Sequence, residues 1–330
     1  MERMRRNMCT AVYFQAKDHF FGRTLDVEKP YGQQVLFTPR QFPFSFRRMG
    51  KMQGHHAILG MGIPVEGYPL YFDAMNECGL AMAGLNFPGN AYYFPETEGK
   101  ENVSPFEFIP WVLGKCADGQ EAKKLLERIS LWDLPFSDDW PLSPLHWLIA
   151  DKNGVCLTVE SMEDGLHITE NPVGVLTNNP PFSYHMTHLC DYMQLSRLPP
   201  VNQFGANLKP YSRGMGAMGL PGDMSSASRF VRAAFVKEKM TTGKNNQENV
   251  NQFFHVLGAV EQPLGCVQLE DGQLEFTDYA GCMHLEKGIY YYKTYENSGL
   301  SAVDMHRENL EGDELKAFSL RREMSVFYQN

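Results

Sequence analysis

A cysteine near the start of the chain is followed by an arginine and an aspartate at hairpin spacing. Cys9 lies in Met8-Cys9-Thr10, and Gly22-Arg23-Thr24-Leu25-Asp26 comes shortly afterwards. A cysteine that is the first residue of a chain carries a thiol and a free α-amine. The thiol can attack a carbonyl carbon, and the amine, with an ordinary pKa of about 7.7–8.0, can take the thiol proton. These residues therefore predict a nucleophile that supplies its own base.

Arg23 and Asp26 are the residues expected to support that cysteine. A guanidinium beside the thiol favours the thiolate, and the Asp26 carboxylate would accept a hydrogen bond from the α-ammonium. The competing interpretations are a buried strand cysteine for Cys9 and a surface ion pair for the other two.

Two asparagines and a second arginine extend the candidate site. Asn86 ends an apolar run in AGLNFPGN, and Asn178 does so in VLTNNP. Either is an ordinary turn residue or a donor to the oxyanion of a tetrahedral intermediate. Arg229 follows a predicted helix start in GLPGDMSSASRF, where Asp223, Ser225 or Ser226 would cap the helix. It is either exposed or close to the thiolate and the polar end of the substrate.

The expected elements alternate hairpins with helices. Alternating apolar residues predict paired strands at 9–14 with 20–25, 68–75 with 80–85, and 145–150 with 155–160. Helical spacing is found in the segment 122–129 and predicts helices at 230–240 and 250–260. Further strands are expected at 266–269, 274–279 and 289–294. The order is typical of an α+β fold, with antiparallel sheets covered by helices. The segment 196–223, rich in Pro, Gly and Met, is expected to be a long functional loop.

Composition narrows the class of protein. The chain has 330 residues and a net charge of −9, which argues against nucleic acid or an anionic membrane as a partner. No stretch is apolar and long enough for a signal peptide or a membrane span, which predicts a cytoplasmic protein. The seven cysteines and ten histidines show no zinc-ligand spacing. We therefore expect neither a metal nor a cofactor.

Beyond these residues, long stretches of the chain resemble the choloylglycine hydrolases. This family holds the conjugated bile salt hydrolases and, as relatives, the penicillin V acylases, all N-terminal nucleophile hydrolases. The resemblance runs from residue 8 nearly to the end, in the same order as in the family, through MCTAVYF, FGRTLD, FTPRQFPFSF, MNECGLAMAGLNFPGNAYY, SPLHWLIADKNG, NPVGVLTNNPPF, YSRGMGAMGLPGD, SSASRFVRAAF and EKGIYYYKTYENSGLSAVDM.

The resemblance implies a four-layer αββα sandwich, commonly assembled as a homotetramer. It implies that a single domain spans 9–330. It also implies a catalytic set in which Cys9 is the nucleophile, Arg23 and Asp26 support it, Asn86 and Asn178 stabilise the oxyanion, and Arg229 completes the polar site. Asparagine at position 86 is typical of the bile salt hydrolases, where penicillin acylases tend to have tyrosine. Conjugated bile salt is thus the expected substrate. Penicillin V hydrolysis, other N-acyl amide hydrolysis or acyl transfer on the same residues is the alternative, and a steroid-binding protein without catalysis is a third possibility.

A steroid requires an apolar pocket with few polar groups. The expected wall residues, which ordinary packing would also explain, are Leu25, Met61, Ile63, Leu134, Phe136 and the loop near 215–220. Arg213 would attract the terminal anion of the substrate, or is simply a solvated loop arginine.

The chain departs from the family at its beginning, where MERMRRN precedes Met8-Cys9. An amide nitrogen cannot act as the base. We therefore expect residues 1–8 to be an extension that is either not translated, with Met8 as the start, or removed.

Overall fold

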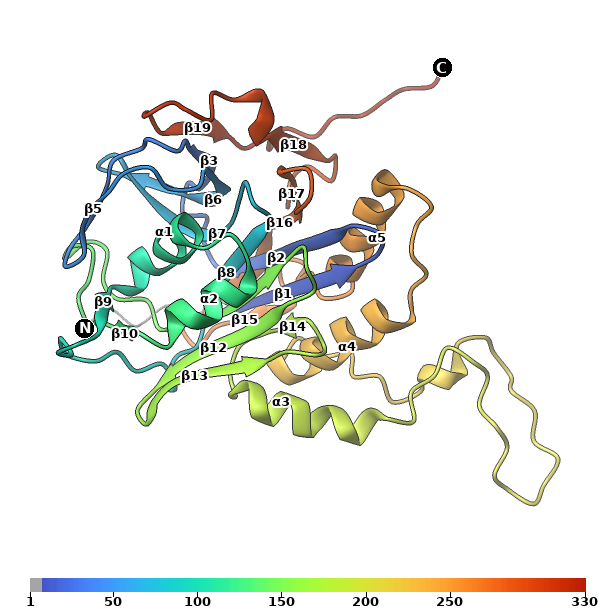
Figure 1. The fold of residues 1–330 in the computed structure, drawn as a ribbon. Helices are drawn as coiled ribbons and strands as arrows, with labels where there is room; N and C mark the ends of the chain where they lie inside the picture. The colour runs from blue at the N-terminus through green and yellow to red at the C-terminus, as the bar shows by residue number, and fades with distance from the viewer. Residues whose placement is uncertain (1–7) are drawn as a thin grey trace.

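Two antiparallel sheets form the centre of the computed structural model, which describes residues 8–330 (Figure 1). The first sheet has the order β14-β1-β2-β16-β17-β18, and β15 pairs with β16. Its strands are β1 (Met8–Gln15), β2 (His19–Val27), β14 (Val175–Leu176), β15 (Val267–Gln268), β16 (Leu274–His284), β17 (Ile289–Thr294) and β18 (Ser301–Asp304).

The second sheet has eight strands in the order β13-β12-β11-β8-β7-β6-β3-β19. They are β3 (Gln34–Thr38), β6 (Ile58–Val65), β7 (Tyr68–Asn76), β8 (Leu80–Asn86), β11 (Leu145–Asp151), β12 (Cys156–Met162), β13 (Gly165–Glu170) and β19 (Lys316–Ser319). Two small sheets pair β4 (Phe44–Phe46) with β5 (Gly50–Met52), and β9 (Glu101–Val103) with β10 (Ile129–Leu131).

Helices cover the outer face of each sheet. The first sheet packs against α4 (Ser226–Lys239) and α5 (Asn246–Gly258), with α3 (Phe182–Leu189) beside α4. The second packs against α1 (Pro105–Lys115) and α2 (Gly119–Leu126). Contacts of β8 with β1 and β2 join the two sheets face to face. These layers are the αββα sandwich that the sequence predicts, so the expected fold class is confirmed.

The core explains why most strands are apolar on both sides. One cluster of buried side chains lies between the sheets and beneath α4 and α5, and includes Leu25, Met61 and Phe253. A second cluster lies between the second sheet and α1 and α2, and includes Trp111 and Trp147. Burying one such side chain contributes about 1.5–3 kcal/mol, so together these layers fix the strands that hold the site.

Several expected elements are confirmed with small changes at their ends. All three predicted strand pairs form, and the Ser225 hydroxyl caps α4 by accepting from the Ser228 N–H. The helix expected at 122–129 ends at Leu126, because Ile129 already belongs to β10, where it pairs with Glu101 of β9. The strand expected at 266–269 is only Val267–Gln268, and the one expected at 274–279 continues to His284.

Short 3-10 turns occur at η1 (Cys190–Tyr192), η2 (Met215–Ala217) and η3 (Met305–Arg307). The 196–223 loop projects away from the sandwich (Figure 1).

Two glycines allow β2 and β16 to approach closely beside Arg23. Gly22 pairs with Cys282, next to the pair of Arg23 with Gly281. A Cβ added to Gly22 would collide with the Gly281 carbonyl oxygen, which is rigid backbone. The position of Arg23 therefore depends on the missing side chain at Gly22.

We predict that Gly22→Ala lowers the free energy of unfolding by about 1–3 kcal/mol, because β2 and β16 must separate to admit the methyl group. The matched control is Gly258→Ala at the end of α5, where an added Cβ meets nothing within 4 Å. This control is expected to leave stability unchanged or to raise it by up to about 1 kcal/mol. Urea unfolding of both variants measures the difference, and equal stability would contradict the close approach.

Candidate active site

Cys9 lies on β1, and the β1–β2 register places the supporting side chains next to it. Cys9 pairs with Leu25, Ala11 with Arg23, and Met8 with Asp26. Residues two apart in a strand share a face, so Arg23 lies diagonally across from Cys9. The Arg23 Nη2 donates to the Cys9 Sγ, and both side chains are buried. The hairpin thus brings the thiol and its cation together.

The second sheet fixes the other end of Arg23. Its Nη1 donates to the carbonyl oxygens of Gly84 at 2.5 Å and Phe72 at 3.3 Å. Burial lowers the pKa of Arg23, but Cys9, Tyr279 and the fully buried Asp73 raise it, and the net result is a raised pKa. Asp73 in turn accepts hydrogen bonds from the Tyr279 hydroxyl at 2.5 Å and the Tyr290 hydroxyl at 2.7 Å. The buried guanidinium is therefore compensated by a carboxylate from β7.

Arg229 reaches the same site from the first turn of α4. Its Nη1 donates to the Cys9 carbonyl oxygen at 2.5 Å and to the Thr10 Oγ1 at 2.7 Å, and its Nη2 donates to the Asn178 Oδ1 at 2.8 Å. Its side chain is fully buried, and its Nη1 lies 4.0 Å from an Asp26 carboxylate oxygen. This arginine therefore holds the backbone of the nucleophile in place.

Asp26 is held by partners from the far end of the chain. Its carboxylate accepts hydrogen bonds from the Thr277 Oγ1 at 2.6 Å and the Gln262 Nε2 at 3.2 Å. Burial raises the pKa of Asp26 to about 6, against the opposing effect of Arg229. The Cys9 nitrogen is bonded to Met8 here and donates to the Asn178 Oδ1 at 2.8 Å. Asp26 lies 4.0 Å from Arg229, and the free α-amine that it is expected to orient forms only in a chain that begins at Cys9.

The two asparagines meet at the thiol. The Asn178 Nδ2 donates to the Asn86 carbonyl oxygen at 2.7 Å, while its Oδ1 accepts from Cys9 and Arg229. The backbone N–H of Asn86 hydrogen-bonds the thiol and lowers the pKa of Cys9. A backbone donor at this place can also serve an oxyanion that forms on a carbonyl attacked by the sulfur.

While Met8 is attached, Cys9 nevertheless favours its neutral thiol form over the thiolate. Burial raises the pKa of Cys9, and Asp26 adds to this, whereas Arg23, the Asn86 N–H and Arg229 oppose it. The nucleophile therefore needs a base to take its proton.

A carboxylate that the sequence pattern did not single out lies next to the start of β1. The Glu275 Oε1 accepts a hydrogen bond from the Met8 N–H at 2.8 Å, and only 1% of Glu275 is exposed. Burial raises the pKa of Glu275 to about 8, and neighbouring Asp26 adds to the effect. Two buried carboxyls thus flank the nitrogen end of the nucleophile.

The expected pocket residues fall into separate places. Leu25 pairs with Cys9, and Leu25 and Met61 belong to the buried cluster that contains Cys9. Ile63 is buried further along β6. Leu134 and Phe136 are half-buried, and the Phe136 ring lies 5.2 Å from that of Phe106.

Arg213 is exposed on the projecting 196–223 loop. Leu25 and Met61 therefore belong to the same inter-sheet core as Cys9, whereas the other residues expected to contact substrate lie outside that core.

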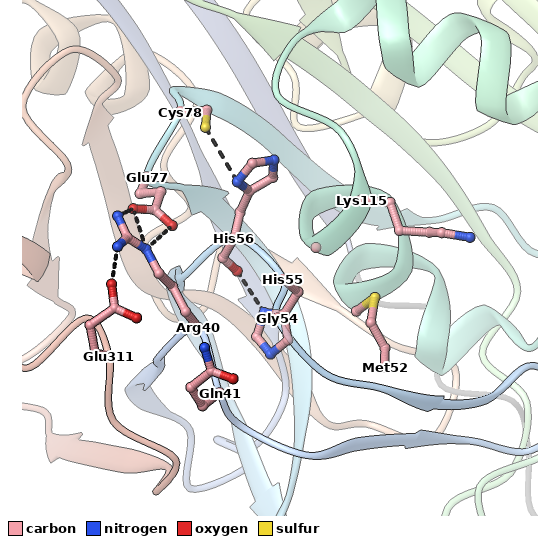
Figure 2. Close-up of a pocket in the computed structure, with 11 residues that line it drawn as sticks. Arg40, Gln41, Met52, Gly54, His55, His56, Glu77, Cys78, Lys115 and Glu311 are labelled. Carbon is pink, nitrogen blue, oxygen red and sulfur yellow. Dashed lines mark hydrogen bonds and ion pairs between the residues drawn. The ribbon is translucent and has the colours of Figure 1, made fainter.

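A hollow of about 700 Å³ lies elsewhere, where the β3–β6–β7 part of the second sheet meets α1 (Figure 2). Arg40 ion-pairs there with Glu77 and Glu311, and the Cys78 Sγ lies 3.5 Å from the His56 Nδ1. Burial raises the pKa of Cys78, as it does that of Cys9, but Cys78 lies in the turn between β7 and β8, where no free α-amine can serve as its base. Cys9 therefore remains the candidate nucleophile.

The four layers, with Cys9 buried near the start of β1, are typical of the amide hydrolases of the N-terminal nucleophile class. The family model for linear amide C–N hydrolases of the choloylglycine hydrolase family matches residues 9–318. The chain belongs to this family. Among the described residues, no helix is both long and apolar enough to cross a membrane.

Relatives agree over nearly the whole chain. A bile salt hydrolase/transferase from Lactiplantibacillus plantarum is 47% identical over 98% of this chain and 100% of its own length. A solved structure of a conjugated bile acid hydrolase from Clostridium perfringens has a TM-score of 0.90 at 37% identity, covering 98% of this chain and 100% of that one. A penicillin V acylase from Agrobacterium tumefaciens shares the fold, with a TM-score of 0.73 at 20% identity over 94% of this chain and 91% of that one.

The raised pKa of Glu275 predicts a pH dependence of stability in a chain that retains Met8. The native carboxyl keeps its proton up to about pH 8, whereas the ordinary value is 4.5. Its contribution to stability is therefore complete below pH 4.5 and is lost as the pH rises through about 8. Glu275→Gln removes this loss, so the variant gains stability relative to the parent as the pH rises.

Urea unfolding near pH 5 and pH 8.5 measures this gain, with the exposed Glu163→Gln as the matched control. The control is expected to differ from the parent by the same amount at both pH values. A pH-independent effect of Glu275→Gln would mean that the native carboxyl does not hold its proton.

Proposed function

We propose that this chain hydrolyses the amide bond of glycine- or taurine-conjugated bile salts, with Cys9 as the nucleophile. The observation that carries the proposal is the buried Cys9 thiol, which accepts a hydrogen bond from Arg23. Arg229 and Asn178 hold the backbone of the same residue. The full-length similarity to bile salt hydrolases supports the substrate class.

The mature enzyme begins at Cys9 in this proposal. The lone pair of the Cys9 nitrogen in a peptide bond is delocalised into the carbonyl group and does not accept a proton, so residues 1–8 must be absent. Of this extension, residues 1–7 lie outside the described part of the structure, and Met8 is the first residue of β1. The single catalytic domain then spans 9–330.

The reaction proceeds through a thioester. The α-amine takes the thiol proton, the sulfur attacks the amide carbon, and the carbonyl electrons move to oxygen. The Asn86 N–H and the Asn178 amide stabilise that oxyanion, while Arg23 and Asp26 hold the nucleophile. The C–N bond breaks as the ammonium returns its proton to the leaving nitrogen. Water then attacks the thioester, again with the amine as base, and releases the bile acid.

The bound steroid would lie against Leu25, Met61, Ile63, Leu134 and Phe136, with Arg213 attracting its terminal anion. The support is the apolar character of the first five and the charge of the last. Acyl transfer is a second activity of the same thioester, when a free amine attacks in place of water. Two relatives are named bile salt hydrolase/transferase, one from Lactiplantibacillus plantarum and one from Clostridium perfringens, and these names favour acyl transfer.

We also propose that the protein is a cytoplasmic homotetramer. The 196–223 loop projects from the sandwich and carries a set of exposed apolar side chains that a partner subunit would cover, namely Leu198, Val201, Phe204, Leu208, Tyr211 and Met218 (Figure 1). The exposed surface of one chain is otherwise an unusual place for so many large apolar groups.

Native mass spectrometry is expected to find four copies of the chain, and Phe204→Ser with Tyr211→Ser to shift the population toward smaller species. The matched control is Phe327→Ser, an exposed aromatic outside the loop. A monomeric parent protein would contradict the assembly without affecting the proposed reaction.

Cys9→Ala is expected to lower the release of glycine or taurine by at least about 10³-fold, because the nucleophile and its oriented attack are lost. The matched control is Cys78→Ser, which is expected to stay within about twofold of the parent. Both conjugates are assayed in preparations whose intact mass is measured, and the active chain is expected to begin at Cys9.

A fully active preparation that retains residues 1–8 would rule out the α-amine as base. A chain that begins at Cys9 and leaves both conjugates intact would rule out bile salts and favour penicillin V or another N-acyl amide.

A further inference from the structure

We propose that Asp18, His284 and Glu286 form a binding site for a divalent transition metal ion of the zinc type. The site lies at the turn of the β1–β2 hairpin, where β1 ends, and Cys9 lies near the start of the same strand. His284 ends β16 and Glu286 follows it, before β17 begins. It is therefore separate from the catalytic residues.

The distances between the candidate ligand atoms fit one ion. The His284 Nε2 lies 2.9 Å from the Asp18 Oδ2 and 3.7 Å from the Glu286 Oε2. One ligand atom from each of the three residues lies within 4.8 Å of the other two. Atoms about 2.0–2.2 Å from a tetrahedral zinc ion are about 3.4 Å apart, so only small side-chain movements would be needed.

A second histidine lies beside these three residues and holds the Glu286 carboxylate in place. The His19 Nδ1 lies 2.7 Å from the Glu286 Oε1. The Glu286 carboxylate is already oriented by the His19 backbone N–H, at 2.9 and 3.1 Å from its two oxygens. One imidazole with two carboxylates suits Zn²⁺ and its neighbours, whereas Ca²⁺ and Mg²⁺ prefer oxygen ligands alone.

His284 is prepared for this role by its surroundings. Only 1% of its side chain is exposed, and the Phe20 ring stacks on it at 4.9 Å. Within the described residues the buried Nδ1 has no hydrogen-bond partner, so every polar contact of this ring is made by Nε2, toward the two carboxylates.

Positive and polar neighbours limit the affinity without closing the site. The positive charges of Lys287 and Lys17 act electrostatically on His284 and Asp18, and they would repel a cation bound there. The Asn246 Nδ2, at the start of α5, donates to the Asp18 Oδ2 at 2.7 Å. A bound ion would therefore join the β1–β2 turn to the β16–β17 turn, next to α5, and would stabilise the fold.

The test is calorimetric titration with Zn²⁺ alone. Exposed and catalytic thiols also bind zinc, so the parent is the Cys9→Ala, Cys190→Ser, Cys266→Ser chain. We expect one ion per chain, and a rise in Tm of about 4 °C at a zinc concentration of 100 times Kd. Asp18→Asn and Glu286→Gln in this parent are each expected to weaken binding about 100-fold.

The matched control is Asp164→Asn, which disrupts an exposed pair with His167 at 2.7 Å that has no third ligand within residues 8–330. It is expected to bind zinc as the parent does. Melting curves in the presence of a chelator show that each variant is folded before the titration. If the parent binds no zinc, or if Asp18→Asn and Glu286→Gln bind it as tightly as Asp164→Asn, then these residues form a hydrogen-bonded network and no metal site.

Discussion

The structure depends on two arginines that are completely enclosed between its layers. A buried guanidinium is tolerated only where carboxylates and carbonyl oxygens replace its water. Arg23 donates to carbonyl oxygens of β7 and β8 and interacts electrostatically with Asp73, and Arg229 donates to the backbone of β1 and lies 4.0 Å from Asp26. Because these partners come from both sheets and from α4, the sandwich must assemble in one register for the charges to be satisfied.

The same constraint prepares the thiol. Burial raises the pKa of Cys9, while Arg23 and the Asn86 N–H oppose that effect at the sulfur itself. The site therefore holds a neutral thiol in a place where a thiolate, once formed, has donors around it. Such a site requires a base, and the α-amine of Cys9 becomes available only when the chain begins at that residue. The buried carboxyls of Asp26 and Glu275 lie beside it.

The β1–β2 hairpin carries polar clusters at both of its ends. At one end Arg23 and Asp26, which support Cys9, pair with β16, and at the other Asp18 and His19 contact His284 and Glu286 at the β16–β17 turn. Long pairing with β16 connects the two, and this pairing is tight because Gly22 has no side chain. A stabilising contact at the turn would therefore act on the strand that positions the nucleophile.

Local sequence determined the hairpin, the start of α4 and the candidate nucleophile, because alternation and capping act over a few residues, and the structure chose Ser225 among the three possible caps. The resemblance to a family supplied Asn86, Asn178 and Arg229 as a set, and the structure places them around Cys9. Only the tertiary structure could bring in Asp73, Glu275 and Thr277, which lie in apolar strands with no local signal. It also paired Asp18 with His284 across 266 positions, where sequence spacing shows no metal ligands. Pairing between strands distant in sequence decides these contacts, and local patterns do not encode it.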